Sequence, residues 1–341
     1  MVTNNTTMAR PLRLGFTGDV MLGRLVDEHQ RRRDVMAVWG GMADRLRSVD
    51  GLFVNLECCL SKGGTPWTRT YRPFLFRASP DWALRALTEV GVDWASLANN
   101  HVLDFGESAL TDTLDHLDDA DIAHAGAGRT RSQAWEPTLV EVDGLRVALV
   151  SFTDNTPEYA AGPHSPGTAH AEVDVDDEET MRLVGDALDA ARGFEPDLLV
   201  ASIHWGPNMV TTPPSRFEAF AHWLAEEGVD LVHGHSAHVF QGVEVYDGSV
   251  ICYDTGDFVD DYAVDADLHN DRSFLFEVTV DPTRKEISRL RLVPTEIRDY
   301  AVHPAPPPVA EWSRKRMREL SSAYDTRFER DDDALVLSLD R

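Results

Sequence analysis

The chain has 341 residues, with 58 acidic and 32 basic side chains and a formal net charge of −26. This balance argues against a nucleic-acid-binding protein, because neutralising phosphates requires clustered Lys and Arg. It also argues against long anionic polymers as ligands unless a local basic patch compensates. The apolar fraction of 43% is typical of a globular protein with a substantial core.

The cysteines and the N-terminal stretch bear on the compartment. Cys58, Cys59 and Cys252 form no C-x-x-C pair, so neither a disulfide framework nor a zinc knuckle is indicated, and a reducing compartment fits better. The first residues lack the apolar core of a signal peptide. No run approaches the roughly 20 apolar residues of a membrane span. We therefore expect a cytoplasmic protein without a membrane partner, in which residues 1–11 are mobile.

Strand-like and helix-like segments alternate along most of the chain. The expected strands cover residues 12–17, 51–57, 92–97, 146–152, 198–203 and 229–232, and the expected helices cover 79–90, 107–118, 179–192 and 215–227. This alternation predicts an α/β fold with parallel strand pairing. We expect one catalytic domain over residues 12–300, including two further strands at 273–280 and 287–293. A C-terminal helical extension, residues 301–341, then packs on it.

Two other segments carry a prediction. The basic run Arg31–Arg33 is placed on a helix and interpreted as a solvated face. Residues 154–178 form a long irregular segment rich in Pro, Gly and His. A connection of that length in a compact domain is typical of a functional loop or lid.

Polar side chains recur where the predicted strands end. They are Asp19, Asn55, Glu57, Asn100, His101, Asp104, His204, His235 and His238. In open α/β sheets, ligands bind outside the carboxyl ends of the strands. Imidazole and carboxylate groups bind metals and transfer protons near neutral pH. The pattern predicts a metal site at the strand ends, which the stretch 233–257 completes with the carboxylates of Asp254 and Asp257.

The same residues carry a family resemblance. Gly18-Asp19, Asn55-Leu-Glu57, Asn99-Asn100-His101, His204-Trp205-Gly206 and Gly234-His235-Ser-Ala-His238 resemble, in order, the motifs of the CapA family. That family is named for poly-γ-glutamate capsule synthesis and belongs to the calcineurin-like metallophosphoesterase superfamily. The resemblance covers about residues 12–260. It implies a calcineurin-like four-layer αββα sandwich with a metal site at the C-terminal ends of the strands.

The resemblance also implies roles for individual residues. Asp19, Glu57, Asn100, His204, His235 and His238 resemble the metal ligands of the superfamily. His101 resembles its catalytic histidine, and Asp104 resembles the carboxylate that orients this histidine.

Three departures from the superfamily pattern change the expected metal content. Met21 stands where phosphoesterases have a ligand histidine, Glu57 replaces the bridging aspartate, and the closing Gly-His-x-His is lengthened by one residue. We therefore expect one firmly bound divalent ion, Ca²⁺, Mn²⁺ or Mg²⁺, and a second one bound weakly.

Histidines that are not needed as ligands are available for acid–base catalysis. One pair is His101 with Asp104, and the other is His235 or His238 with Asp254 or Asp257. Two such pairs on opposite sides of a Cα atom can remove and return its proton. Resemblance to a CapA-like branch that epimerises a residue in ribosomally made peptides, such as lasso-peptide precursors, implies a peptide epimerase.

Two other functions stay open. One is a metal-dependent hydrolase, either a phosphoesterase or a γ-glutamyl peptide hydrolase linked to poly-γ-glutamate metabolism; the other is a binding protein without activity. For substrate contacts we expect Arg72 to clamp a carboxylate and Trp205 to line an aromatic pocket. Surface salt bridges and core packing are the respective alternatives.

Overall fold

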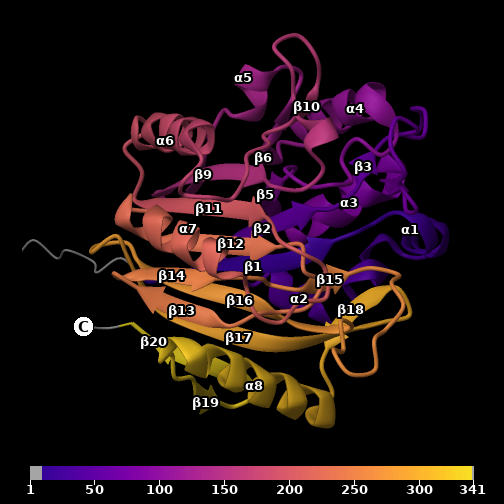
Figure 1. The fold of residues 1–341 in the computed structure, drawn as a ribbon. Coiled ribbons are helices and arrows are strands. Elements are labelled where there is room, and N and C mark those ends of the chain that lie inside the picture. The colour runs from indigo at the N-terminus through magenta and orange to yellow at the C-terminus, as the bar shows by residue number, and fades with distance from the viewer. Residues whose placement is uncertain (1–9, 340–341) are drawn as a thin grey trace, which may run out of the picture.

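The computed structural model describes residues 10–339, so most of the N-terminal segment expected to be mobile lies outside the described residues. Two large β-sheets face each other, and helices cover the outer face of each sheet (Figure 1). The predicted four-layer α/β sandwich is confirmed.

The first sheet carries the N-terminal half of the site. Along the described chain its strand order is β19-β20-β17-β16-β1-β2-β5-β6, with β15 beside β1 and β18 beside β17. Its strands are β1 (Leu12–Val20), β2 (Gly51–Leu56), β5 (Val92–Ser96), β6 (Ala123–Ala125), β15 (Asp257–Val259), β16 (Arg272–Asp281), β17 (Glu286–Arg298), β18 (Ala301–Pro304), β19 (Glu329–Asp331) and β20 (Ala334–Ser338). Parallel pairing, as predicted, joins β1, β2, β5 and β6. The later strands β16, β17 and β20 pair antiparallel.

The second sheet has the order β13-β14-β12-β11-β9-β8. Its strands are β8 (Thr138–Val142), β9 (Leu145–Thr153), β11 (Leu198–His204), β12 (Leu231–His235), β13 (Val243–Tyr246) and β14 (Ser249–Cys252). Four of them, β9, β11, β12 and β14, run parallel. Two short ladders lie in the connections: β3 (Cys59–Leu60) with β4 (Arg77–Ala78), and β7 (Ala127–Gly128) with β10 (Gly167–Thr168).

The helices follow the strands closely. They are α1 (Arg24–Gln30), α2 (Ala43–Leu46), α3 (Pro80–Val90), α4 (Gly106–Asp119), α5 (Arg131–Ala134), α6 (Glu178–Arg192), α7 (Ser215–Glu226) and α8 (Pro307–Ser321), with 3₁₀ turns η1 (Val35–Met42), η2 (Pro157–Tyr159) and η3 (Ser322–Tyr324). Local signals explain several ends: Pro80 opens α3, Gly91 closes it at φ 77°, and Asp177 caps α6 by accepting the Thr180 N–H at 2.7 Å.

Three apolar clusters hold the layers together. α1 to α4 pack on the first sheet through residues such as Val26, Leu87 and Leu110. α6 and α7 pack on the second sheet, and the layer between the sheets includes Phe16 stacked on Phe53 at 4.8 Å. Burial of these clusters is the main source of stability and keeps the strand ends in fixed positions.

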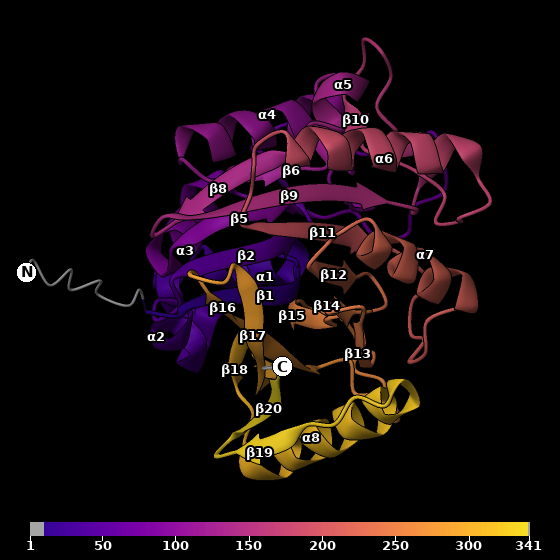
Figure 2. The ribbon, with the colours of Figure 1, turned by 90° about the vertical axis from the view of Figure 1, so that its left-hand side faces the viewer.

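Two details differ from the expectations. The helix α1 ends at Gln30, because the Arg33 N–H bonds the Gln30 carbonyl at 3.0 Å in a tighter turn; Arg32 and Arg33 therefore lie beyond the helix. The C-terminal segment is not only helical. Below the sheets α8 lies beside β13, and β20 adds to the edge of β17 (Figure 2).

The start of β12 allows a prediction about stability. Asp230 accepts the Leu199 N–H at 2.7 Å, and burial raises the pKa of this carboxyl to about 6. A carboxyl whose pKa is higher in the folded state lowers stability as pH rises, with the full effect above pH 6 and none below its unfolded pKa near 4. Asp230→Asn should therefore raise the free energy of unfolding at pH 8 by about 1–3 kcal/mol. Urea unfolding at pH 8 and pH 4.5 checks this, and an equal effect at both values would contradict it.

Candidate metal centre

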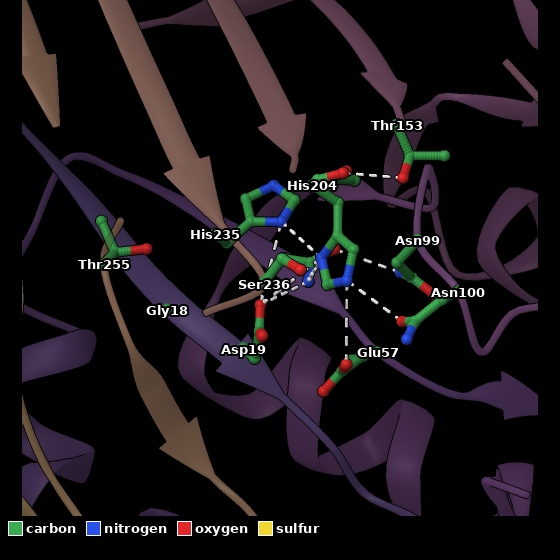
Figure 3. A network of polar contacts seen from close by, with 12 residues as sticks. Gly18, Asp19, Glu57, Asn99, Asn100, Thr153, His204, His235, Ser236 and Thr255 are labelled. Atoms are coloured by element: carbon green, nitrogen blue, oxygen red, sulfur yellow. Dashed lines mark hydrogen bonds and ion pairs between the residues drawn. The ribbon is translucent and has the colours of Figure 1, made fainter. Parts of the chain in front are cut away.

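The candidate site lies where strands of both sheets end. Asp19 lies in β1 in parallel register with Asn55 of β2 and with Asp257 of β15. In the second sheet, His204 of β11 is in register with His235 of β12. Parallel pairing therefore brings these side chains to one edge, and the facing of the two sheets brings the two sets together (Figure 3).

Glycines let the backbone strands approach each other at this edge. A Cβ atom on Gly18 would lie 1.8 Å from the Gly256 carbonyl oxygen, and one on Gly234 would lie 2.1 Å from that of Tyr253. Both distances are too short for any side chain, so the residues before Asp19 and His235 must be glycine for the site to close.

One set of ligand atoms centres on Asp19, His204 and His235. Their donor atoms all lie within 4.8 Å of one another. The Nδ1 atoms of the two histidines are 2.9 Å apart, and Asp19 Oδ1 lies 3.9 Å from the first and 3.8 Å from the second. Ser202 Oγ lies 3.0 Å from the other nitrogen of His235 and orients that ring. These three side chains therefore converge as ligands of one cation would.

The ring of His204 connects this set to a second region. Its Nε2 atom lies 3.0 Å from Asn100 Oδ1 and 3.9 Å from Glu57 Oε1 (Figure 3). Five of the six residues predicted as metal ligands, Asp19, Glu57, Asn100, His204 and His235, are thus brought together. Their roles as ligands stay a prediction.

A second set of donor atoms shares Asp19. It comprises Asp19, Glu57, His238 and Asp257, again with all atoms within 4.8 Å of one another. His238 Nδ1 lies 2.9 Å from Asp257 Oδ1 and 3.6 Å from Asp19 Oδ2. His238 has φ 60°, a left-handed backbone that costs of order 1 kcal/mol and is held here by the surrounding chain. The last histidine of the widened motif is therefore turned into the site.

The charges in the site call for a cation. Within residues 10–339, Asp19 Oδ2, Glu57 Oε1 and Asp257 Oδ2 are buried carboxylate oxygens without a hydrogen-bond partner. Burial, and then the neighbouring carboxylates, raise the pKa of Asp19, Glu57 and Asp257 well above the usual value. Desolvation of this size is normally offset by a bound positive charge.

The histidines respond in the opposite direction. Burial lowers the pKa of His204 and His235 well below the usual value and that of His238 to about 3, so the imidazoles are neutral. Neutral imidazole and ionised carboxylate are the forms that bind metal. This donor set fits a divalent ion, and Ca²⁺, Mn²⁺ and Mg²⁺ stay the expected choices.

Next to the ligand sets lies a buried His–Asp pair. His101 Nδ1 is 2.5 Å from Asp104 Oδ2, which also accepts the Phe76 N–H at 2.7 Å, and Asp104 Oδ1 accepts the Tyr159 hydroxyl at 2.8 Å. The Phe76 ring stacks on His101 at 3.7 Å. The other imidazole nitrogen, Nε2, points to the site and lies 4.0 Å from Glu57 Oε1. The pair has the geometry of a histidine oriented for proton transfer.

The second predicted pair is His238 with Asp257, and Asp254 is not part of it. Both carboxylate oxygens of Asp254 accept backbone N–H groups, from Ala237 and Gly256, each at 2.7 Å. Asp254 therefore fixes the loop that carries His238. Its expected role as a proton-transfer partner is corrected to a structural one.

The predicted substrate contacts also need correction. Trp205 is 2% exposed, stacks on Phe217 at 5.2 Å and donates to the Tyr253 carbonyl, so it packs in the core and lines no aromatic pocket. Arg72 donates to Thr156 Oγ1 at 2.8 Å and to the Asn100 carbonyl, and its side chain is only 14% exposed. These contacts hold the turn that carries His101, and they leave Arg72 little freedom to clamp a substrate.

Met21 explains one departure from the superfamily pattern. The side chain is fully buried, and its sulfur accepts the Gly23 N–H at 3.1 Å. At the position where phosphoesterases have a ligand histidine, this chain has a methionine that packs in the core.

Sequence reasoning passed over Tyr262. Its hydroxyl donates to Glu57 Oε2 at 3.0 Å, and its ring lies edge-on against His238 at 4.9 Å. Its position, three residues after the end of β15, is the feature of the sequence that could have indicated a role in the site. By holding Oε2, Tyr262 leaves Glu57 Oε1 directed at the site.

Tyr262→Phe should weaken divalent-ion binding about 10-fold, because a hydrogen bond that orients a ligand carboxylate typically contributes a factor of 10–100. Competition with a fluorescent chelator measures the affinity. Tyr246→Phe, which loses a hydroxyl bonded to Glu226 outside the site, is the matched control. Equal affinities in both variants would contradict the assigned role of Tyr262.

Among the described residues, no helix is both long and apolar enough to cross a membrane.

Similarity to solved structures is modest. A hypothetical protein from Thermus thermophilus matches with a TM-score of 0.44 at 18% identity, over 86% of this chain and 96% of that one. A purple acid phosphatase from yellow lupin matches with a TM-score of 0.41 at 9% identity, over 87% of this chain and 53% of that one.

Sequence comparison is more informative. A probable polyglutamine synthesis accessory protein of Mycobacterium tuberculosis is 32% identical over 292 residues, covering 82% of this chain and 74% of that protein. The capsule biosynthesis protein CapA of Bacillus anthracis is 28% identical over 250 residues, covering 73% of this chain and 60% of that protein. The family model described as bacterial capsule synthesis protein PGA_cap matches residues 13–262. The predicted CapA resemblance is therefore confirmed, and the chain belongs to this family.

Proposed function

We propose that this protein is a metal-dependent enzyme that uses His–Asp acid–base chemistry to epimerise a Cα atom in a peptide substrate. The observation that carries the proposal is the presence of two buried His–Asp pairs at one site. His101, paired with Asp104, lies 4.0 Å from Glu57, and His238, paired with Asp257, lies 3.6 Å from Asp19. Inversion at carbon needs a base on one face and an acid on the other, and two pairs can supply both.

The reaction needs one pair that accepts a proton and one that donates a proton, and the surroundings of the two pairs differ accordingly. Burial, and then the neighbouring carboxylates, raise the pKa of Asp257 well above its usual value, which favours a protonated carboxyl beside His238 Nδ1. Asp104 is bound by three donors and orients His101 so that Nε2 faces the site. His101 is therefore assigned as the base and His238 as the acid.

The proposed steps balance without a co-reactant. His101 Nε2 takes the Cα proton, and the electron pair of the C–H bond moves to the neighbouring carbonyl to form an enolate. His238 Nε2 then gives its proton to the opposite face of Cα, while Asp257 returns a proton to Nδ1. A divalent ion at the shared ligand set would supply positive charge that stabilises the enolate. After product release, solvent restores both protonation states.

The family supports a peptide substrate. The relatives named above are a probable polyglutamine synthesis accessory protein and a capsule biosynthesis protein. A chain of amide-linked amino acids has an acidic Cα–H next to each carbonyl group. Peptide chemistry therefore suits both the family and the two pairs.

The test is a reaction in D₂O with a candidate peptide and Mn²⁺ or Ca²⁺. We expect deuterium uptake at one Cα and the D-residue after acid hydrolysis, with the rate of uptake lowered by about 10²- to 10⁴-fold in His101→Gln. Peptide fragments or phosphate released without Cα deuterium would overturn the proposal. An unchanged peptide that nevertheless binds would favour a binding protein.

A metal-dependent hydrolase is the second candidate, and the four-residue set of Asp19, Glu57, His238 and Asp257 favours it. If His238 is a ligand there, a second ion can bind and only the His101 pair is left for proton transfer. The candidates differ in the effect of His238→Gln on metal content. An epimerase keeps its bound ion in this variant, whereas a two-metal hydrolase loses one of two equivalents, measured by elemental analysis.

A further inference from the structure

A basic and aromatic segment borders the site in this acidic protein. Residues 61–78 contain four basic and no acidic side chains, whereas the whole chain carries a net charge of −26. The same segment contains four aromatic residues. We name residues 61–78 the basic rim; its charged and aromatic members are Lys62, Trp67, Arg69, Tyr71, Arg72, Phe74, Phe76 and Arg77.

The basic rim is fixed directly against the catalytic pair. Phe76 stacks on His101 at 3.7 Å and donates its N–H to Asp104. Arg72 bonds the carbonyl of Asn100, the residue before His101. A peptide whose reacting residue reaches His101 must therefore lie beside this segment.

The outer part of the rim presents unusual surface. Tyr71 is 90% exposed and Phe74 is 54% exposed. Leu25 of α1, 39% exposed, belongs to the same small group of exposed large apolar side chains among the described residues. The guanidinium of Arg24 lies 5.0 Å from the Phe74 ring centre and 5.6 Å from that of Phe76. Exposed aromatic rings beside cations are typical of recognition surfaces.

A cavity of about 340 Å³ opens between the rim and α1. Basic side chains of both elements line it, with Leu75 and Phe105 on the apolar side and Asp27 and Glu28 as the acidic members; the basic ones are Arg24, Arg31, Lys62 and Arg77. Arg24 has φ 52°, so the chain holds this residue in a strained left-handed conformation at the cavity.

Arg24 lies 3.3 Å from the buried carboxylate of Asp261, whereas Lys62 and Arg69 pair with exposed partners. Lys62 and Asp81 are 2.6 Å apart with side chains 64% and 69% exposed, and Arg69 lies 3.8 Å from Glu107. Solvent-exposed pairs of this kind are weak, so a ligand carboxylate can compete for the cation. Elsewhere the acidic surface repels an anion, which directs it to the rim.

We propose that the basic rim and this cavity bind an acidic segment of the peptide substrate that flanks the reacting residue. Lys62 and Arg69 meet its carboxylates, and Tyr71 and Phe74 contact its apolar atoms. This inference rests on the proposed function for the position of the reacting residue. The binding itself needs neither metal nor turnover.

Fluorescence anisotropy with labelled hexaglutamate and hexaglutamine peptides tests the inference on the full chain. At 50 mM NaCl, hexaglutamate should bind at least about 10-fold more tightly than hexaglutamine, and most of this difference should be lost at 500 mM. The double variant Lys62→Glu/Arg69→Glu should lose it as well. Tyr71→Ala should weaken binding at both salt concentrations, because the aromatic contact is not electrostatic.

The matched control is Arg182→Glu/Lys315→Glu, which reverses two exposed cations on α6 and α8. Equal binding of the two peptides, or equal loss in the rim and control variants, would overturn the inference. Binding through the rim without Cα exchange would overturn the proposed reaction alone. Cα exchange with peptide binding indifferent to the rim would overturn the rim alone.

Discussion

Asp19→Asn is expected to abolish tight divalent-ion binding, because Asp19 is the one residue shared by both sets of ligand atoms. An asparagine keeps the size of the side chain, but it removes the charge and half of the carboxylate donors. We expect the affinity for Mn²⁺ or Ca²⁺ to fall by more than about 100-fold, beyond what is typical when a group that only orients a ligand is lost.

Thermal unfolding measures this effect. An ion present at 100 times its dissociation constant stabilises the wild-type fold by about 2.7 kcal/mol, and the variant should show no such gain. Without ions, Asp19→Asn should be at least as stable as the wild type, because it removes a buried carboxylate whose pKa burial raises. A metal-dependent stabilisation that persists in the variant would contradict the shared role of Asp19.

His101→Gln is expected to lower turnover by about 10²- to 10⁴-fold, the usual contribution of a general acid or base. His101 is oriented by Asp104 at 2.5 Å, and its Nε2 atom is directed at the site. Divalent-ion stabilisation should be unchanged, which separates loss of chemistry from loss of metal. Asp104→Asn should reproduce part of the loss, because the carboxylate that fixes the ring tautomer is removed.

The rate of Cα deuterium exchange is the measurement, and His124→Gln is the matched control. His124 lies 3.1 Å from Asp118 and belongs to neither ligand set. If His101→Gln exchanged deuterium as fast as this control, His101 would not be the base.

Much of the site could be predicted because it depends on parallel strands. Asp19, Glu57, Asn100, His204 and His235 each lie at the end of an apolar strand or shortly after it, and parallel strands of one sheet end at one edge. The strands themselves could be predicted because buried parallel strands are continuously apolar in sequence. These features are local in sequence, so a single chain reveals them.

Other features depend on contacts between distant segments. Asp257 reaches Asp19 only because β15 pairs with β1 across more than 230 residues of chain, which no local pattern indicates. Asp254 and Trp205 are residue types that often belong to functional sites. In the structure, however, both carboxylate oxygens of Asp254 accept backbone N–H groups, and the Trp205 ring stacks on Phe217. Tyr262 was missed because its role depends on a contact with Glu57, which is distant in sequence.

The C-terminal segment illustrates a further limit. Ala334–Ser338 is a short apolar run, and its own sequence does not indicate that it pairs with β17. The domain boundaries near residues 12 and 300 stay predictions. The buried thiols of Cys58, Cys59 and Cys252 are compatible with the predicted cytoplasmic location, which also stays a prediction.

The most direct test of the metal centre is anomalous diffraction from crystals soaked in Mn²⁺. The structure predicts a peak within bonding distance of Asp19, His204 and His235, with a weaker second peak between Asp19, Glu57 and Asp257 if a second ion binds. His101 should stay outside the coordination sphere, paired with Asp104. Crystals that show no anomalous peak among these carboxylates and histidines at millimolar Mn²⁺ would contradict the assignment of this cluster as a metal centre.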